Sequence, residues 1–426
     1  MADRIMLFAI PGFFILMALE LLAAWIMKRR VYRLNDAINS IGLGVLSQIV
    51  GVFTKLLTIG IYAWVVQRVA LLELPMDRAW VWITALVLYD FCYYWLHRMG
   101  HEVNVLWAAH VVHHQSELYN LSTALRQTGS GALLGWIFYL PMALLGYPVE
   151  VFAVAAVIDL LYQYWIHTEL VGKLGWFDRV FASPSNHRAH HAVNDRYLDR
   201  NYGGIFILWD RMFGSFVEED DTDPPVYGTR APLRSWNPLW ANAEVYWAMA
   251  TDAWHARRWR DKFRVWIARP GWRPADVAER FPKPDFDRQR EEYDPPVSRT
   301  MAVYCLVQFA LLLGFGVQFL QTAMLMSLSA VVAYLVFLVG SLVLLGALLE
   351  GRRLAPWFEV ARLVLFGVVP AVSGLWLDGG ELPSVMRWVC ALAAAISFAM
   401  LMLAWRGYSA MRRDGSAAVA GDAGQS

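Results

Sequence analysis

The stretch AWVWITALVLYDFCYYWLHRMGHEVNVLWAAHVVHH, residues 79–114, runs from an apolar segment straight into five histidines. Its apolar part, residues 79–96, has about the length that crosses the hydrocarbon core of a membrane as a helix. Histidine makes up only 10 of the 426 residues, so five in one stretch indicate a site and not a compositional bias. The stretch therefore predicts a membrane helix that carries a histidine cluster to the membrane boundary.

The composition of the whole chain is also typical of a membrane protein. Hydrophobic residues make up 58% and charged residues 17%, whereas soluble proteins carry about a quarter charged residues. A formal net charge of +1 gives no reason to expect a nucleic-acid partner. Cys92, Cys305 and Cys390 lie in apolar runs without metal-ligand or disulfide spacing, so they indicate no redox compartment.

Nine apolar runs predict nine membrane crossings, and a polar segment, residues 168–299, divides them. Two short runs, 131–145 and 149–166, form a predicted hairpin that turns near Gly146 and ends at His167. We therefore expect an all-α membrane protein, a multi-pass helical bundle. Its expected parts are a histidine-containing domain over 1–299 with about five spans, a four-helix transmembrane region of unknown role over 300–410 and a disordered tail over 411–426. The runs are 5–27, 40–66 (interrupted by Lys55), 79–96, 131–145, 149–166, 301–320, 325–348, 357–377 and 385–405.

The basic residues predict the orientation of these spans. With the loop Lys28–Arg33 in the cytoplasm, the arginine-rich polar segment and Arg352 fall on the same side, as the positive-inside rule requires. All the clustered histidines then lie on the cytoplasmic side. The first run lacks a small-residue cleavage pattern and is expected to be a retained anchor. The excess of arginine over lysine suggests a GC-rich bacterial genome, which favours a bacterial inner membrane over the endoplasmic reticulum.

Nine of the ten histidines form a constellation typical of metal ligands. One pair is four residues apart, and the pattern H-x-x-H-H occurs twice. Because residues three and four apart share a helix face, each cluster projects its imidazoles to one side. His167 ends the hairpin at the level of the clusters, whereas His255 is expected to be a packing or surface residue. The predicted metal ligands are His97, His101, His110, His113, His114, His167, His187, His190 and His191.

The number of histidines favours two metal ions with open coordination positions. Neutral imidazole suits zinc, copper, iron and nickel, but a structural zinc site closes with four ligands, often cysteines. Nine imidazoles exceed one such site about twofold, and chemistry with dioxygen needs a vacant position on iron. Asp90, Glu102 and Asp195 are candidates to orient an imidazole by accepting its second N–H.

The motifs HRMGH, HVVHH, NHRAHH and DRNYGGIFILWDRMFGSF resemble those of the membrane fatty acid hydroxylase and sterol desaturase superfamily of di-iron enzymes. DFCYYWLHRMGHEVNVLWAAHVVHH, LYNLSTALRQ and LLYQYWIHTEL are most similar to its alkylglycerol monooxygenase branch, and the similarity covers about residues 5–276. Asn186 stands where that branch often has another histidine, and Ala192 where it often has glycine. Both departures leave the substrate open.

The resemblance implies an iron-dependent oxidoreductase with two irons, a membrane monooxygenase that uses O2 to oxidise a lipid, in this branch by cleaving a glyceryl ether. It also implies tetrahydrobiopterin as cofactor, although no residue here indicates a pterin site and the electron donor is unknown. An alternative within the superfamily is a hydroxylase or desaturase acting on an acyl chain, a sterol or an aminolipid. An alternative of another class is a non-catalytic membrane protein that binds or transports metal.

Tryptophans and arginines alternate over residues 236–273. Trp247 and Trp254 are seven apart and share a helix face, and Trp259 follows among several arginines. Tryptophan and arginine together are typical of a helix in the headgroup layer of a membrane. The segment predicts such an interfacial helix, with packing against the polar segment as the alternative.

Overall fold

The computed structural model describes the backbone of residues 2–422 and the side chains of residues 9–54 and 56–406, so the side chain of Lys55 lies outside the described part. No β-strand occurs among the described residues, and only two isolated β-bridges are formed. Within this described part, seven helices are long and apolar enough to cross a membrane, which confirms the all-α, multi-pass class. These candidate spans are Ala9–Ile26, Leu34–Thr54, Ala79–Glu102, Arg299–Leu325, Leu328–Leu349, Ala355–Ser373 and Ser384–Arg406.

The chain divides into two compact units. The first, here the histidine unit, comprises the chain up to Arg33 together with Val50–Leu233 and Ala241–Glu292. The second, here the C-terminal unit, comprises Leu34–Ile49, Arg234–Trp240 and the chain from Tyr293 onward. The division near residue 292 lies close to the boundary expected at 299, but the two short segments of the C-terminal unit were not expected from the sequence.

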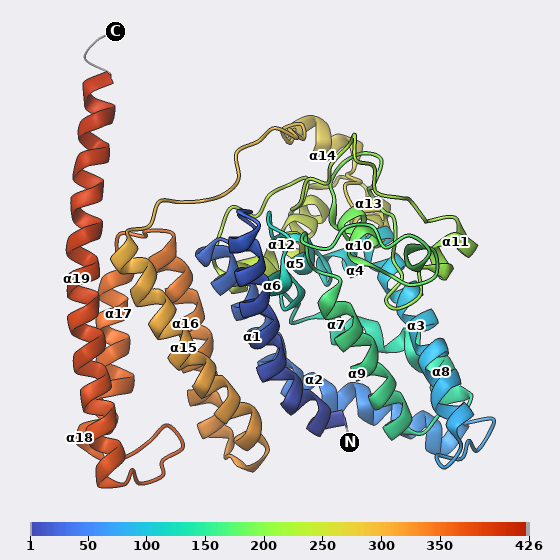
Figure 1. The fold of residues 1–426 in the computed structure, drawn as a ribbon, viewed down its shortest axis with the longest axis horizontal. Helices are drawn as coiled ribbons and strands as arrows, with labels where there is room; N and C mark the ends of the chain where they lie inside the picture. Colours follow the sequence, from blue (N-terminus) through green and yellow to red (C-terminus); the bar gives the residue numbers. More distant parts are fainter. Residues whose placement is uncertain (1, 423–426) are drawn as a thin grey trace. The chain divides into compact units, whose positions relative to one another are not determined.

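Helices α3 and α9 form the centre of the histidine unit. They pack along each other more extensively than any other pair of helices, and the short helices α4, α5 and α10 gather at the end of α3 (Figure 1). The elements are α1 Ala2–Ile26, α2 Leu34–Val69 (from Val50 onward), α3 Ala79–Glu102, α4 Asn104–Ala108, α5 Val111–His114, α6 Leu121–Ala124, α7 Gly131–Gly135, α8 Leu140–Leu144, α9 Val149–Trp165, α10 Pro184–His191, α11 Leu208–Phe213, α12 Pro238–His255 (from Ala241 onward), α13 Trp259–Ile267 and α14 Ala275–Arg280.

The tip of the predicted hairpin lies beside the loop that precedes α3. The Leu71 N–H donates to the Leu144 carbonyl oxygen at 2.8 Å, and the Tyr62 hydroxyl donates to the Tyr147 carbonyl oxygen at 3.0 Å. Gly146 has a φ of 86°, and a Cβ there would collide with the Leu72 carbonyl, so the turn requires glycine. Because α3 and α9 both start at this tip, both carry their histidines to the opposite end.

The two arms of this hairpin are shorter than a full membrane span. The first arm is broken into α7, a 3₁₀ turn over Trp136–Tyr139 and α8. The second arm, α9, has 17 residues, or about 25 Å at 1.5 Å per residue, against a hydrocarbon core of about 30 Å. Neither arm is among the seven candidate spans, so the expected nine crossings stay a prediction.

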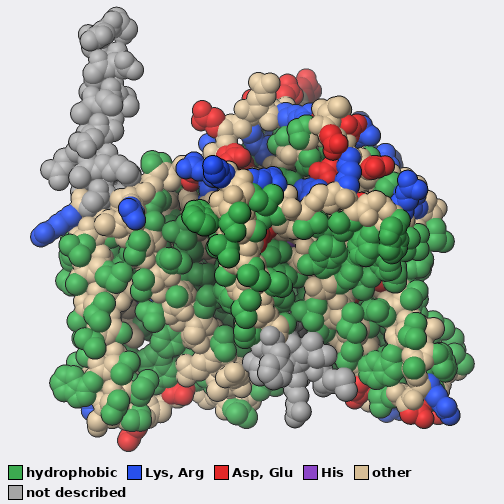
Figure 2. All heavy atoms as spheres, viewed as in Figure 1, with side chains coloured by type: hydrophobic (Ala, Val, Ile, Leu, Met, Phe, Trp, Pro, Cys, Tyr) green, Lys and Arg blue, Asp and Glu red, His purple; other side chains and the backbone are tan. Residues whose placement is uncertain are grey.

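Charged side chains gather at the histidine-bearing end of the histidine unit, around α10, α13 and α14, and a band of mostly apolar side chains separates them from a few charged side chains at the opposite edge (Figure 2). Helix α13 breaks this pattern, because Trp259, Phe263 and Ile267 are 73%, 68% and 69% exposed. Trp254 in α12 is 82% exposed. This apolar surface on an arginine-rich helix fits the predicted interfacial helix.

The C-terminal unit consists of long helices at the four predicted C-terminal spans. The third of them contains a π-helical segment, η4. The last continues as a helix to Asp422. A disordered tail was expected from residue 411, and that assignment stays a prediction. Residues 34–49 join this unit because Gly42 lets α2 approach Leu342 and Phe309 closely. The elements are α15 Arg299–Thr322, α16 Leu328–Leu349, α17 Ala355–Leu363, η4 Val364–Val368, α18 Val369–Ser373 and α19 Ser384–Asp422.

Candidate metal centre

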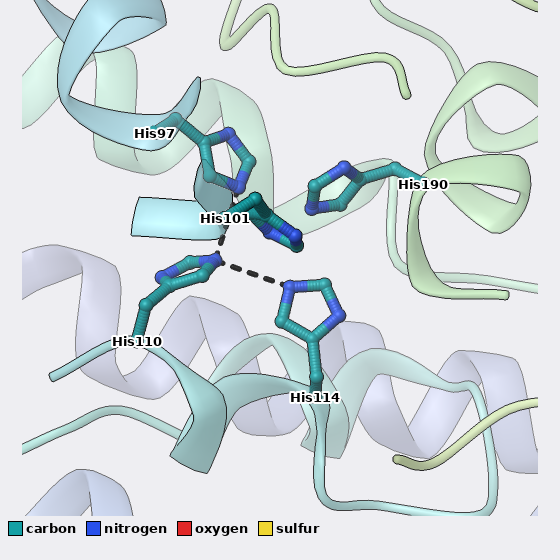
Figure 3. A group of neighbouring side chains, drawn as sticks. All are labelled: His97, His101, His110, His114 and His190. Carbon is teal, nitrogen blue, oxygen red and sulfur yellow. Dashed lines mark hydrogen bonds between the residues drawn. The ribbon is translucent and has the colours of Figure 1, made fainter. Parts of the chain in front are cut away.

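All nine predicted histidines come together in two groups. Within each group one ring nitrogen of every histidine lies within 4.8 Å of the others. His255 is in neither group; its Nδ1 is 2.8 Å from the Thr251 carbonyl oxygen, and its ring lies against Phe281. Figure 3 shows the first group, with its rings converging from different segments of the chain. The first group is His97, His101, His110, His114 and His190, and the second is His113, His167, His187 and His191.

The short helices α5 and α10 divide their histidines between the two groups. In α5, His113 belongs to the second group and the adjacent His114 to the first. In α10, His190 belongs to the first group, and His187 and His191 to the second. Neighbouring residues on a helix do not face the same way, so each helix can serve both groups. Helix α10 is held in register by its N-cap, because the Ser183 hydroxyl accepts from the Asn186 N–H.

Backbone carbonyls orient two imidazoles of the second group. His113 Nδ1 lies 3.0 Å from the Arg126 carbonyl oxygen, and His167 Nδ1 lies 2.7 Å from the Gln163 carbonyl oxygen. A carbonyl oxygen can only accept, so both Nδ1 atoms carry the proton. In a neutral imidazole the other nitrogen is then unprotonated. The two Nε2 atoms therefore each present a lone pair.

These two lone pairs point at one another. His113 Nε2 and His167 Nε2 are 3.1 Å apart, and with both protons on Nδ1 no hydrogen bond can join them. The free energy of this arrangement is favourable only with a cation between the nitrogens. Burial lowers the pKa of His113 to about 4 and the pKa of His167 well below its ordinary value, so protonation does not relieve the repulsion near neutral pH. The pair is thus built to bind a metal ion.

The first group shows the same signature. The Nδ1 atoms of His97 and His190 lie 2.8 Å from the carbonyl oxygens of Tyr202 and Arg200. The Nε2 atoms of His190 and His101 are buried without any hydrogen-bond partner. A buried nitrogen without a partner is costly, and a metal ion would satisfy both.

The spacing of the nitrogens fits a metal ion. Neighbouring Nε2 atoms lie 3.1 Å apart from His97 to His110 and from His110 to His114, and 3.2 Å apart from His187 to His191. A metal–nitrogen bond of about 2.1 Å places nitrogens about 3.0 Å apart at a right angle and about 4.2 Å apart across the ion. Both values lie inside the 4.8 Å that limits each group.

The three carboxylates expected to orient imidazoles bind other partners. Glu102 pairs with Arg98 at 2.9 Å, and Asp195, exposed at the surface, pairs with Arg230. Asp90 accepts from the N–H groups of Ile205, at 2.6 Å, and Phe206. The prediction that they contact an imidazole is therefore wrong, because backbone carbonyls take that role. Of the described carboxylates, Asp199 lies nearest to this role, 3.6 Å from His101 Nδ1.

The motif that follows the third histidine cluster holds these carbonyls in place. Asp210 accepts from the N–H groups of Tyr202, at 2.8 Å, and Gly203, at 2.7 Å. Asn201 has a φ of 58° and donates from its side chain to the carbonyl oxygens of Asn186 and Val217. The loop whose carbonyls bind His97 and His190 is therefore fixed from both sides. The sequence showed only that this motif resembles that of the superfamily and did not reveal its role, since any residue carries a carbonyl.

Burial keeps the imidazoles outside the membrane helices neutral. It lowers the pKa values of His110, His114, His187, His190 and His191 well below the ordinary value, and neighbouring imidazoles lower them further. Neutral imidazole is the form that binds metal. The centre therefore presents neutral imidazoles to a cation, and all of its histidines except the half-buried His110 are buried.

A buried histidine centre at the end of apolar helices defines the class of protein: a membrane metalloenzyme of the fatty acid hydroxylase type. The sequence profile of the family Fatty acid hydroxylase matches residues 82–215, the region that contains all nine histidines. That family is iron-dependent. The predicted superfamily and the predicted oxidoreductase class are both confirmed.

The chain belongs to the alkylglycerol monooxygenase family. It is 37% identical to the alkylglycerol monooxygenase of Homo sapiens over 363 residues, which cover 84% of this chain and 80% of the relative. It is 38% identical to that of Danio rerio, with the same coverage. A second profile, Alkylglycerol monooxygenase C-terminal domain, matches residues 301–375.

Relatives of the hydroxylase type match less of the chain. An ornithine lipid hydroxylase of Rhizobium tropici is 34% identical over 142 residues, 32% of this chain and 41% of the relative. No solved structure matches the chain.

Proposed function

We propose that this protein is an iron-dependent monooxygenase that cleaves glyceryl ether lipids. The reaction inserts one oxygen atom of O2 into the C–H bond beside the ether oxygen, while two electrons and two protons reduce the other oxygen atom to water. The resulting hemiacetal breaks its bond to the ether oxygen and yields a fatty aldehyde and glycerol. The animal relatives, which align with 84% of this chain and with 80% of their own length, bear this activity in their names.

The observation that carries the proposal is the pair of unprotonated nitrogens, on His113 and His167, that face each other at 3.1 Å. The five histidines of the first group would hold one iron, and the four of the second group would hold another. Iron so bound supplies the activation of O2. The protein itself orients four of the imidazoles by backbone carbonyls, those of His97, His113, His167 and His190, and burial favours the neutral form that binds metal.

The place of the site in the fold suits a lipid substrate. The histidines lie where α3 ends and just after α9 ends, and α3 is a candidate membrane span. A lipid in the bilayer presents its ether oxygen near such a boundary and its chain beside the helices. The exposed apolar face of α13 supports this placement, because its end is tied to α4: the Asn104 side chain donates to the Val265 carbonyl oxygen at 2.9 Å.

The test is oxidation of 1-O-hexadecylglycerol by the purified protein in lipid nanodiscs under labelled O2. Ether cleavage gives hexadecanal that carries the label, trapped at once by reduction to the alcohol. A hydroxylase of acyl chains instead gives a labelled lipid with its ether intact, and that outcome would reject ether cleavage in favour of the alternative. The ester analogue 1-hexadecanoylglycerol serves as the matched control, since it lacks the activated C–H bond.

The electron donor and the side of the membrane are part of this proposal. Tetrahydrobiopterin, implied by resemblance alone, is the first donor to try, against reduced ferredoxin and NADPH with a reductase. The distribution of arginine along the chain supports the cytoplasmic side. The excess of arginine over lysine supports a bacterial inner membrane. Reporters fused after Leu377 and after Arg413 should lie outside and inside, respectively. Both reporters on one side would contradict the orientation.

A further inference from the structure

Two buried aspartates of the histidine unit lie together, Asp90 in α3 and Asp159 in α9. They are 0% and 2% exposed. A Cβ built on Gly204 would lie 2.8 Å from Asp90 Oδ1 and 2.9 Å from Asp159 Oδ1, so both oxygens border the same point of the backbone. The two carboxyl groups lie within hydrogen-bonding reach of each other. Because two ionised carboxylates repel each other strongly when they are close and buried, one of the two must carry a proton.

Asp90 is the ionised member of this pair. Its carboxylate accepts three hydrogen bonds, from the backbone N–H groups of Ile205 at 2.6 Å and Phe206 at 3.1 Å and from the Trp209 indole at 2.7 Å. Hydrogen bonds from N–H donors stabilise a carboxylate in its ionised form. The loop that follows the third histidine cluster is therefore bound to a negative charge on α3.

Asp159 is the member that carries the proton. Its Oδ2 accepts from the Gln163 side chain at 2.6 Å, whereas its buried Oδ1 has no donor among the residues that the structure describes. A proton on Oδ1 turns this atom into a donor, and the Asp90 carboxylate is the acceptor within its reach. The result is an O–H···O⁻ hydrogen bond, which is roughly twice as strong as a bond between neutral groups.

This hydrogen bond joins the supports of both histidine groups. On one side of the pair, the bound loop directly follows Tyr202, whose carbonyl oxygen lies 2.8 Å from His97 Nδ1 in the first group. On the other side, Gln163 lies one turn further along α9, and its carbonyl oxygen lies 2.7 Å from His167 Nδ1 in the second group. A change at the pair therefore reaches an orienting carbonyl of each group.

We propose that Asp159 is a positioning residue that carries a proton at neutral pH and donates it in a hydrogen bond to Asp90. This bond ties α9 to α3 and to the loop 202–209, and so keeps an orienting carbonyl of each histidine group in place. The proton stays in the pair and takes no part in the oxidation. The expected loss of lipid oxidation rests on the proposed function, whereas the protonation of Asp159 and its effect on iron binding do not.

The first test compares two replacements of Asp159 in the full-length protein. Asp159→Asn keeps the pattern of bonds, because an amide N–H can donate to Asp90 and the amide oxygen can accept from Gln163. Asp159→Leu is similar in size but offers no donor. We expect iron content and lipid oxidation to stay within about twofold of the wild type in Asp159→Asn and to fall by about tenfold to a hundredfold in Asp159→Leu, as for other supporting residues of metal sites.

The iron content decides this test without reference to activity. The iron content of the wild type in Asp159→Leu would overturn the proposal, and so would an Asp159→Asn variant as poor in iron as Asp159→Leu. Iron binding as expected without any cleavage of the ether would count against the proposed function alone.

Infrared spectroscopy detects the proton itself. In micelles of a detergent without carbonyl groups, the spectrum of the wild type minus that of Asp159→Asn should contain the C=O stretching band of a protonated carboxylic acid. Asp252→Asn is the matched control, because Asp252 is a buried aspartate that Arg273 holds ionised at 2.8 Å, so its removal should leave this band unchanged. A difference spectrum with only the bands of an ionised carboxylate would show that Asp159 carries no proton and would overturn the proposal.

Discussion

The histidine unit and the C-terminal unit both bury polar side chains among apolar helices, but they satisfy them differently. In the C-terminal unit the buried charges satisfy each other: Glu359 accepts from Arg362 and from the Tyr304 hydroxyl. In the histidine unit four imidazoles have one nitrogen bonded to a backbone carbonyl, and one nitrogen of every imidazole converges with the others of its group. A network whose buried polar groups all have partners in the protein needs no ligand, whereas converging unpartnered nitrogens need an ion. The difference assigns chemistry to the first unit and support to the second.

Removal of metal should have the largest effect and should separate the two units. Without iron, His113 and His167 face each other with uncompensated lone pairs, so α5 and α10 should loosen. We expect amide exchange in residues 110–114 and 187–191 to rise by at least about tenfold on chelation, since bound metal contributes directly to folding free energy. Exchange in α15 and α16, read in the same sample, should not change. An equal rise of amide exchange in both units would contradict the claim that only the histidine unit depends on a bound ion.

The next largest effect should come from single histidines. His167→Ala should lose the iron of the second group and lower lipid oxidation by more than about a hundredfold, because ligand loss also misplaces the substrate. Iron content by mass spectrometry should fall from two atoms per chain toward one. His255→Ala is the control, since its ring only packs against Phe281 and bonds a carbonyl. Full iron and activity in His167→Ala would remove it from the ligand set.

Asp210→Ala should give a smaller loss, confined to the first group. Asp210 holds the N–H groups of Tyr202 and Gly203 and the Ser215 hydroxyl, at 2.7 to 2.8 Å. The variant should weaken iron binding and oxidation by about tenfold to a hundredfold, as for other supporting residues of metal sites. Asp195→Ala, which removes an exposed ion pair with Arg230, should change neither. An unchanged iron content in Asp210→Ala would mean that Tyr202 does not need this anchor.

The smallest effect should come from the apolar surface of α12 and α13. Trp254→Ser combined with Trp259→Ser should raise the KM for a lipid presented in vesicles by about threefold to tenfold, since each exposed tryptophan contributes interfacial binding. The kcat, and the KM for the same lipid in detergent micelles, should stay unchanged. A fall in kcat would instead indicate that these tryptophans pack within the protein.

Much of the fold follows from local patterns, and its exceptions come from close packing. The four C-terminal spans were predicted within a few residues, because an apolar run of the right length suffices for a membrane helix. The π-helical segment Val364–Val368 leaves no signal in that run. The hydropathy also gives no sign that residues 34–49 belong to the C-terminal unit, because this depends on the close approach of Gly42 to Leu342 and Phe309. Contacts between distant segments are not encoded in the hydropathy of either one.

The sequence by itself determined which side chains form the candidate centre, because histidines three and four apart on short helices must project together. The tertiary structure alone decided how they divide: His113 joins His167, whereas the adjacent His114 joins His97. It also decided what orients them. The acceptors are the carbonyls of residues such as Tyr202 and Gln163, and every residue has a carbonyl, so only the path of the folded backbone selects those that bind an imidazole.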